Sequence, residues 1–551
     1  MRISRIHIKN YRSLRNIDIY PKGLCALVGE NNAGKSNILR ALNLVLGEAY
    51  PSARSLDKTD FFNNDICNSI LIEVYFEDNE ENVEKIFLKA GIDEETEALK
   101  VELKMKYRDY PDEYYVKKDI KEKYGIIHIK AIRDLERHLG QSSWTLLGKI
   151  SRLLNEEFSN VSDESTRIEI DRLYQSIKEK LSIKKFKLLE KELKEALSSQ
   201  LLRTEHDIKL DFQPFDPLDY YKTLQLIPKE LGEIKEISQL GDGTKNMILL
   251  ALFRAYAKTF PGTSIIAIEE PEIYLHPQSC KSLYTLFREL EDKGTQIILT
   301  THHPEFVDLE YFDEICVVRK SKDKDGLYST SVTQVDINSF VEKRRRETGI
   351  HAITSESIRQ FLRNISNSEA NKSFFSRFIV IVEGNTEKFA LPIYAKKLGF
   401  DFDKRSVEVV GVNGKNQIDT FISLYEEFDF PYYVIWDGDK DKQKDVEANR
   451  RITRRLKGEE IDWPETEIAE KFAVFENNWE DEFSKSLPGY DTLVEEAMKI
   501  YGLKKDRNKE IVAKYIANKL AKEEIPDFIV DIVSKIEALW EGYENGKARD
   551  V

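Results

Sequence analysis

The sequence predicts an α/β protein made of two α/β units, with one helical segment inserted in the first unit and another at the C-terminal end. The chain has 551 residues, which is too many for one hydrophobic core and suggests roughly three or four domain-sized pieces. Short β-branched runs alternate with helical patterns in two separate stretches. In each stretch an apolar strand leads directly into a glycine-containing turn. These three observations favour two sheet-containing domains in one chain.

Composition and charge narrow the class further. Hydrophobic residues make up 41% and charged residues 33%, which is typical of a folded protein. No apolar run is long enough to span a bilayer, and segment 1–23 lacks the continuous apolar stretch of a signal peptide. The sequence therefore predicts a cytoplasmic protein with no membrane partner. The net charge of −14 argues against a globally basic nucleic-acid binder but leaves room for a local basic groove.

The cysteines give no sign of a metal site or of a disulfide framework. The four residues lie far apart and form no CxxC pair, which favours buried reduced thiols. They are Cys25, Cys67, Cys280 and Cys316.

Shifts in pattern along the chain predict its domain boundaries. The predicted parts are the N-terminal half of the first α/β domain (1–143), a helical insert (144–205), the C-terminal half (206–335), a charged linker or exposed helix (336–375), a second α/β domain (376–490) and a helical C-terminal part (491–551).

Two apolar stripes at helical spacing mark the insert. The first runs from Leu146 to Phe158 and the second from Ile170 to Leu181. A dimerisation arm and a helical subdomain that covers its own core both account for this pattern.

The first candidate site is the segment 29–36, GENNAGKS, which follows an apolar strand and precedes a helix. It matches the GxxxxGK[ST] pattern in the strand–loop–helix context that this pattern requires. The glycines let backbone N–H groups surround phosphates at a helix N-terminus, while Lys35 neutralises phosphate charge and the Ser36 hydroxyl coordinates Mg²⁺. The candidate nucleotide-binding residues here are Gly29, Asn32, Gly34, Lys35, Ser36 and Asn37.

An acidic strand end supplies the next part of this site. The apolar strand 264–268 ends in Glu269 and Glu270. The first carboxylate is expected to hold the Mg²⁺ shell and the second to polarise the attacking water. Surface charge would explain this pair equally well if it stood alone.

Two further features complete the pattern. The apolar strand 296–300 leads to His302, which is placed to contact a γ-phosphate. A loop with Gly241 and Gly243 lies shortly before the acidic strand. A lone histidine is usually structural, but the four features in this order indicate an ATPase.

The order of these segments closely resembles the ATPase half of structural-maintenance-of-chromosome and recombination-repair ATPases of the ABC class. The resemblance implies that two heads sandwich ATP, with Gly241 and Gly243 presented to the nucleotide of a partner subunit. A homodimer or homotetramer is therefore implied. Glu269 departs from the pattern, because most ABC ATPases have Asp at this place. The longer side chain is expected to alter the Mg²⁺ geometry and to slow hydrolysis.

The second candidate site lies in the second α/β domain. One apolar strand ends in Glu383, with Glu387 four residues on, and another ends in Asp437 and Asp439. An open α/β sheet places its active site at the carboxyl ends of neighbouring parallel strands. Clustered like charges persist only if cations neutralise them. Two Mg²⁺-class ions held there can activate a water and stabilise the leaving oxygen of a phosphodiester.

The EGxxE and DxD pair resembles the Toprim fold of topoisomerases, primases and some nucleases. Together with the upstream ABC head, it is similar to the overcoming-lysogenisation-defect (OLD) family of nucleases over nearly the whole chain. The resemblance implies that Glu383, Glu387, Asp437 and Asp439 bind Mg²⁺ or Mn²⁺.

The OLD resemblance also implies a later acid and a lysine. Glu480 is the best match for the acid, with Glu482 as its competitor. Lys509 is the best match for a lysine that stabilises the cleaved phosphate, with Lys504 and Lys505 close by. The implied catalytic residues are Glu383, Asp437, Asp439, Glu480 and Lys509, with Glu270 in the ATPase site.

Two basic clusters are candidates for guiding the DNA backbone. One is Lys343–Arg346, and the other follows the DxD loop and contains Arg450, Arg451, Arg454 and Arg455. A solvated surface explains any single cluster better, although the second gains from its proximity to the metal site. No zinc finger, helix-turn-helix or RNA-binding motif stands out, so sequence-specific base reading is not indicated.

The sequence thus predicts an ATP-binding, divalent-metal-dependent DNA endonuclease or nickase of the OLD type. The resemblance, which extends to Gabija-like and retron-associated nucleases, implies bacterial anti-phage defence. Its partners would be a helicase, a retron reverse transcriptase with its DNA, or none. One alternative is an SMC-like DNA-bridging or repair ATPase with a non-catalytic Toprim scaffold, and intact acids at five positions argue against it. A topoisomerase or primase is the other, although no nucleophilic tyrosine domain is evident.

Overall fold

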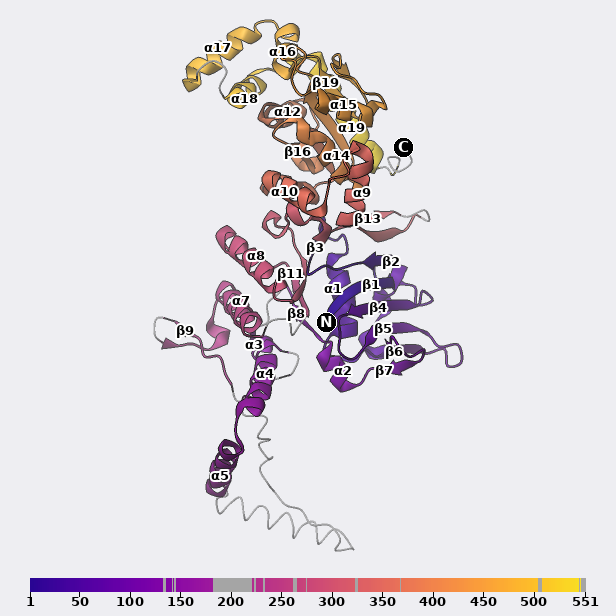
Figure 1. The fold of residues 1–551 in the computed structure, drawn as a ribbon, viewed down its shortest axis with the longest axis vertical. Helices are drawn as coiled ribbons and strands as arrows, with labels where there is room; N and C mark the ends of the chain where they lie inside the picture. Colours follow the sequence, from indigo (N-terminus) through magenta and orange to yellow (C-terminus); the bar gives the residue numbers. More distant parts are fainter. Residues whose placement is uncertain are drawn as a thin grey trace.

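The computed structural model describes residues 1–131, 135–140, 142, 145–181, 221, 224–230, 233–260, 265–273, 275–322, 326–366, 368–503, 508–544 and 546. The molecule is elongated, with the second α/β domain at one end and the helices α4 (Leu146–Val161) and α5 (Glu164–Leu181) at the other (Figure 1). The first α/β domain lies between them. In the described ranges, no helix combines the length and the apolar character needed to cross a membrane.

The first domain contains two six-stranded sheets. One is antiparallel, in the order β2 (Leu14–Ile19), β1 (Arg2–Tyr11), β4 (Ile70–Glu77), β5 (Val83–Ile92), β6 (Leu99–Tyr107) and β7 (Glu113–Tyr115). The other is parallel except for its first edge strand, in the order β14 (Tyr328–Gln334), β13 (Ile315–Lys322), β3 (Leu24–Val28), β12 (Gln296–Thr300), β11 (Ile265–Glu269) and β8 (Ile126–Ile129).

The parallel sheet is covered on both faces, which explains its continuous apolar strands. Helix α1 (Lys35–Leu46) packs in one core between this sheet and the antiparallel sheet. Helices α7 (Asp242–Thr259) and α8 (Pro277–Glu291) cover the opposite face. The parallel strands therefore end together at one edge, where the first candidate site lies.

The second domain repeats this design with a five-stranded sheet. Its order is β16 (Val407–Gly411), β15 (Phe378–Val382), β17 (Tyr432–Asp437), β19 (Phe472–Phe475) and β18 (Glu467–Ile468), and only β18 is antiparallel. One face packs against α14 (Ile418–Glu427) and α15 (Val446–Lys457). The other face carries α12 (Asn385–Leu398), α16 (Trp479–Ser486), α17 (Tyr490–Tyr501), α18 (Lys509–Lys519) and α19 (Asp527–Glu544).

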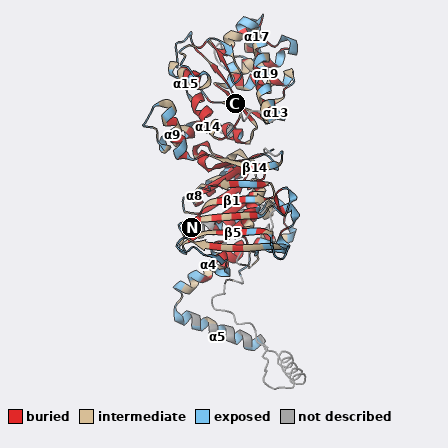
Figure 2. Cartoon of the chain, turned by 90° about the vertical axis from the view of Figure 1, so that its right-hand side faces the viewer, coloured by how far each residue is buried: buried red, intermediate tan, exposed pale blue. Residues whose placement is uncertain are grey.

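The helical insert differs between its two described helices. In α4 the residues Leu146 and Leu147 are buried against the head. In α5 the side chains of Ile168 and Leu173 are 46% and 61% exposed, and Figure 2 shows most of the described helix in contact with solvent. The first stripe thus packs on the head, and α5 covers no core within the described residues. The remainder of the predicted insert, 182–205, lies outside them.

The segment 336–375 is not an open connection as its polar composition suggested. It contains α9 (Ile337–Thr348), α10 (Ser355–Ile365) and α11 (Ser368–Lys372), and the Asp336 carboxylate caps α9. Its apolar residues belong to a buried cluster that runs continuously from the head into the second domain. The sequence of this segment is typical of a linker, because it does not reveal that much of its charge is buried in ion pairs.

Buried ion pairs tie this segment to both neighbours. On one side, Asp419 of α14 accepts hydrogen bonds from Arg344 (2.7 Å) and Arg455 (2.9 Å), and all three side chains are largely buried. On the other side, Nη2 of Arg359 donates to both oxygens of the buried carboxylate of Asp313, at 3.0 and 3.1 Å.

Replacing Asp419 with Ala is expected to lower the free energy of unfolding by about 3 kcal/mol, because two buried guanidinium groups would lose one of the carboxylates that neutralise them and keep only Glu347 and Glu426. The matched control is Asp462→Ala, which removes the exposed partner of Arg450 and is expected to cost less than about 1 kcal/mol. Urea unfolding measures both. Equal, small losses would contradict a structural role for the buried pairs.

Candidate functional site

The phosphate-type loop has the backbone that the sequence predicted. Gly29 and Gly34 have φ angles of 142° and 115°. A Cβ at Gly29 would lie 2.1 Å from the carbonyl oxygen of Val318, and one at Gly34 would lie 2.4 Å from Oγ1 of Thr330. No other residue type fits these two positions, since both the φ angle and the space exclude a side chain.

The loop lysine is held inside the loop. The Nζ atom of Lys35 donates to the carbonyl oxygens of Gly29 (2.8 Å) and Glu30 (2.7 Å). Burial lowers the pKa of Lys35 to about 8, against the opposing effect of Glu270 and Glu272. Its ammonium therefore lies where an anionic ligand would be strongly favoured.

The other predicted residues of this loop differ in their surroundings. Ser36 is the second residue of helix α1 and is half-buried, and Asn32 is exposed with a φ angle of 64°. The amide of Asn37 donates to Oγ of Ser13 at 3.0 Å, which braces the loop against the turn between β1 and β2. Asn37 is therefore a supporting residue in this conformation.

Of the acidic pair on β11, Glu269 has a partner that the sequence analysis missed. Nε2 of His128, on the adjacent strand β8, lies 3.0 Å from Oε1 of Glu269. Burial raises the pKa of Glu269, but the hydrogen bond and charge of His128 outweigh this effect and the pKa lies below its usual value. A histidine inside an otherwise apolar strand was the only sequence sign of this contact.

Glu270 and His302 meet at the carboxyl ends of β11 and β12. The backbone N–H of Glu270 donates to the Thr300 carbonyl at 2.9 Å, and its φ angle is 44°. Burial and the nearby charge of Lys35 lower the pKa of His302, and Glu270 opposes them. The structure thus brings the predicted lysine, acid and histidine together around one edge of the sheet.

A further carboxylate, Glu272, orients this edge. Its Oε1 accepts hydrogen bonds from the Thr301 hydroxyl (2.9 Å) and the His302 N–H (2.6 Å), while burial raises its pKa. Its Oε2 atom is buried and has no hydrogen-bond partner among the described residues. Glu272 follows the predicted acidic pair so closely that no separate sequence signal selects it.

The predicted signature loop leads into helix α7. Gly241 precedes the first residue of this helix and is exposed. A Cβ at either Gly241 or Gly243 would meet nothing within 4 Å. Packing among the described residues therefore does not require either glycine.

In the second domain, parallel strands bring the predicted acids together. Strands β15 and β17 are neighbours, and Oε2 of Glu383 accepts a hydrogen bond from the backbone N–H of Asp437 at 3.2 Å. Glu387 lies in the first turn of α12 and is buried. A Cβ at Gly438 would lie 2.7 Å from the carbonyl oxygen of Glu476, so the DxD turn needs glycine at its centre.

These carboxylates raise one another's pKa. Burial, with Glu387 and Glu383 next in effect, holds the pKa of Asp437 well above its usual range. Burial together with Glu480 and Glu383 raises the pKa of Glu387 to about 7. The pKa of Glu383 is also raised, mainly by burial. Such a group is unstable as a set of free charges and favours a cation.

Asp439 behaves differently from the other acids. Its two carboxylate oxygens accept hydrogen bonds from Lys415 (2.7 Å) and Lys442 (2.7 Å). Burial raises the pKa of Asp439, but the two lysines outweigh burial and lower it. Lys415 is almost fully buried and also donates to the Asp437 carbonyl at 3.0 Å. Neither lysine was selected from the sequence, although Lys442 follows Asp439 by three residues, whereas the proximity of Lys415 arises only in the fold.

The structure separates the candidates for the later acid. Glu480 contributes to the raised pKa values of Glu387 and Asp437, whereas Glu482 pairs with Lys485 at 2.7 Å. Lys509 lies 3.2 Å from Glu480, at the edge of the cluster. Lys504 and Lys505 lie outside the described residues.

The donor set fits a divalent cation in chemistry. Carboxylate oxygens are the ligands that Mg²⁺ and Mn²⁺ prefer, and the buried Oε2 of Glu387 has no hydrogen-bond partner in the described part of the chain. No group of three His, Cys, Asp or Glu side chains among the described residues already has the arrangement of a metal site. The carboxylates thus share a region without forming a closed ligand cage.

One arginine links the phosphate-type loop to the second domain. Nη2 of Arg377 donates to Oε2 of Glu30 in the phosphate-type loop at 2.8 Å, and its Nη1 donates to Oε2 of Glu544 in α19 at 3.1 Å. Arg377 directly precedes β15, the strand that leads to Glu383. The same residues line a cavity of about 840 Å³ between the head and the second domain.

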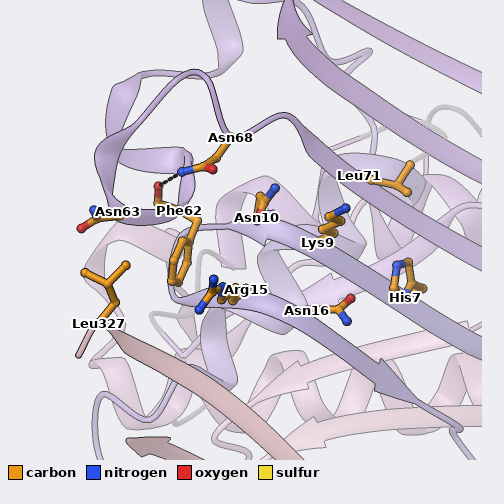
Figure 3. A pocket seen from close by; sticks show the side chains of 10 residues that line it. All are labelled: His7, Lys9, Asn10, Arg15, Asn16, Phe62, Asn63, Asn68, Leu71 and Leu327. Atoms are coloured by element: carbon orange, nitrogen blue, oxygen red, sulfur yellow. Dashed lines mark hydrogen bonds between the residues drawn. The ribbon is translucent and has the colours of Figure 1, made fainter. Parts of the chain in front are cut away.

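A separate cavity of about 510 Å³ opens beside strands β1 and β2 (Figure 3). Its basic side chains are His7, Lys9 and Arg15, and none of its ten lining residues is acidic. It contains no residue of either candidate site and does not have the donors of a metal centre.

Most residues of the two basic clusters are paired within the chain. Lys343 lies 2.8 Å from Glu427, and Arg450 lies 2.6 Å from Asp462. Arg344 and Arg455 share Asp419, as described above. These four side chains stabilise the domain and offer little charge to a ligand.

Two family descriptions match the chain. The AAA domain of AbiEii-toxin type (Type IV TA system) matches residues 24–308, and the overcoming lysogenization defect protein-like TOPRIM domain matches residues 374–439. Both stretches contain the motifs described above.

Three curated nucleases are similar to the chain. The OLD nuclease of Thermus scotoductus is 27% identical over 476 residues, which cover 83% of this chain and 86% of the relative. The Old nuclease of Escherichia phage P2 is 25% identical over 455 residues, with coverages of 76% and 74%. Endonuclease GajA of Bacillus cereus is 26% identical over 348 residues, with coverages of 56% and 56%.

Proposed function

The chain belongs to the AAA-domain family and is an OLD-family ATPase–Toprim protein, and from this premise we propose that it is an ATP-binding DNA endonuclease or nickase that needs a divalent cation. The observation that carries the proposal is the buried carboxylate group at the ends of β15 and β17, where Asp437 has a pKa well above its usual range. The nuclease names of the relatives support DNA as the substrate.

In this proposal Glu383, Glu387, Asp437 and Glu480 hold Mg²⁺ or Mn²⁺. The bound cations supply water activation and stabilisation of the leaving oxygen. Asp439 keeps Lys415 in place beside the carboxylates, and it is a direct ligand only when the two lysines release it. Lys509, at the edge of the cluster, neutralises charge on the cleaved phosphate.

At the head, Lys35 binds the β- and γ-phosphates of ATP, and Ser36 and Glu269 complete the Mg²⁺ shell. Glu270 orients the attacking water and His302 contacts the γ-phosphate. Gly241 and Gly243 would contact ATP on a second head, and in the described part of the chain a Cβ at either position would meet no neighbour within 4 Å. This arrangement calls for a homodimer or homotetramer.

Anti-phage defence is the biological setting that the family resemblance supports. The chain would act in the cytoplasm, alone or with a partner such as a helicase or a retron reverse transcriptase. Incubating the purified chain with supercoiled plasmid and Mg²⁺ or Mn²⁺, with and without ATP, tests the proposed activity. DNA binding without nicking under any of these conditions would favour a DNA-bridging ATPase with a non-catalytic Toprim domain.

Nucleotide is expected to change the nicking rate through the Arg377 bridge, by about fivefold or more. Arg377→Gln is expected to remove most of this response, because it uncouples Glu30 from the start of β15. Gly243→Asp is also expected to weaken the nucleotide response, because it would block contact between this loop and the nucleotide of a second head. Nicking time courses at saturating metal, with ATP, a non-hydrolysable analogue or neither, measure the effect.

Arg363→Gln is the matched control, since Arg363 also pairs across elements but contacts Glu310 rather than the phosphate-type loop. It should keep the wild-type response. An unaltered response in Arg377→Gln would exclude the bridge as the route of coupling.

A further inference from the structure

Arginines from two distant segments line one cavity of about 380 Å³. Arg346 comes from the last turn of α9, while Arg451 and Arg454 lie three residues apart on one face of α15. Arg455 and the carboxylates of Glu347 and Asp419 form the rest of the lining. Helices α9, α14 and α15 lie together on the same side of the second domain (Figure 1).

The two carboxylates in this cavity are already neutralised. Arg455 contacts Glu347 at 2.6 Å and Asp419 at 2.9 Å, and the second oxygen of Asp419 accepts from Arg344. Together, Arg344 and Arg455 balance the charge of both acids. The remaining three arginines therefore give the cavity a net positive charge.

These three arginines have contacts that a ligand can replace. Arg451 donates to the neutral amide oxygen of Asn416 at 3.3 Å, and Arg346 donates to the backbone carbonyl of Glu342 at 3.3 Å. Arg454 pairs with Glu460 at 3.0 Å, but both side chains are nearly half exposed, and such surface pairs contribute little.

The cavity adjoins the carboxylate cluster. Asn416, the partner of Arg451, is bonded also to Asp445 at the start of α15. The residue before it, Lys415, contacts both Asp439 and the carbonyl of Asp437. A single short turn thus connects the arginines with the acids of the DxD loop.

We propose that this cavity binds backbone phosphates of the DNA whose scissile bond lies at the carboxylate cluster; the inference rests on the proposed nuclease function. Guanidinium groups bind phosphate oxygens through paired N–H donors, and such contacts position a duplex without reading its sequence. The DNA-positioning residues in this proposal are Arg346, Arg451 and Arg454. The other arginines, Arg344, Arg450 and Arg455, form ion pairs within the chain.

The test is the salt dependence of DNA binding by the full chain, measured by fluorescence anisotropy of a short labelled duplex in EDTA, where no cleavage occurs. For the double variant Arg451→Gln/Arg454→Gln, we expect the slope of log K against log salt to fall by about 1.8, since each phosphate contact contributes about 0.9. Binding at low salt should weaken about tenfold or more. Arg450→Gln is the matched control and should keep the wild-type slope, because Arg450 lies on the same helix but pairs with two carboxylates, Glu447 and Asp462, and does not line the cavity.

A wild-type slope in the double variant, or an equal fall in the control, overturns the inference. If the wild-type chain nicks plasmid in Mg²⁺ but the salt slope of the double variant is unchanged, only this inference is overturned and the proposed function stands. Failure of the wild-type chain both to bind and to nick DNA would overturn the proposed function as well. The Tm checks the fold, and if the Tm of the double variant falls well below the wild-type value, the exposed Arg346→Gln decides, with an expected fall in slope of about 0.9.

Discussion

Replacing Asp437 with Asn is expected to abolish plasmid nicking, with a rate loss of about a thousandfold or more. This carboxylate lies at the centre of the acidic group, where burial and the neighbouring acids raise its pKa. Removing its charge would weaken cation binding and withdraw several kcal/mol of transition-state stabilisation, and about 4 kcal/mol corresponds to a thousandfold in rate. Glu383→Gln should have a similar effect, because Glu383 contacts the backbone of Asp437.

Asp441→Asn is the matched control for this change. Asp441 is an exposed acid in the same loop, so its replacement should leave nicking within about twofold of the wild-type rate. Fluorescent ATP should bind normally to both variants, because the head is a separate domain. Nicking by Asp437→Asn at nearly the wild-type rate would refute the assignment of the Toprim site.

Thermal unfolding gives a second measure of the same site. Mg²⁺ or Mn²⁺ should raise the Tm of the wild-type chain, because a ligand of the folded state stabilises it. In Asp437→Asn the metal-dependent rise should be lost, and the metal-free variant should be at least as stable as the wild type, since a buried charge is removed. An undiminished metal response in the variant would place the cations elsewhere.

Replacing Glu270 with Gln is expected to slow ATP hydrolysis by about 10²–10⁴-fold while ATP binding stays within a few-fold. The carboxylate acts on the attacking water, and the amide keeps the shape of the side chain without the basic oxygen. Lys35→Ala should instead weaken ATP binding by about 10–100-fold, because the ammonium contacts phosphate in the ground state. Fluorescent-nucleotide titration and phosphate release distinguish the two losses. Normal hydrolysis by both variants would refute the ATPase assignment.

The predictions from the sequence are most successful where a motif is local. The α/β class and the OLD-family membership are confirmed, since the loop around Lys35 and the EGxxE and DxD segments carry their geometry within a few residues. The roles of the individual site residues and the domain boundaries stay predictions. The site residues lie close together in space because neighbouring parallel strands end at the same edge of each sheet. The alternation of strands and helices in the sequence predicted such sheets.

Contacts made only through tertiary structure could not be predicted. His128 reaches Glu269 because β8 lies beside β11, and Lys415 reaches Asp439 because a turn from another part of the domain folds over the DxD loop. The burial of the polar segment 336–375 could not be predicted for the same reason. The burial of Arg344 becomes reasonable only when its partner, Asp419, is known.

The ion pairs on both sides of this segment have a mechanical consequence. A flexible joint needs residues that can change their backbone angles at little cost, but here Arg344 is tied to Asp419 in the second domain and Arg359 to Asp313 in the head. Swinging one domain against the other would break buried charge pairs on at least one side. A rotation of the head should therefore carry the Toprim domain with it as one rigid body, and the parts of the Toprim domain farthest from the head should move most.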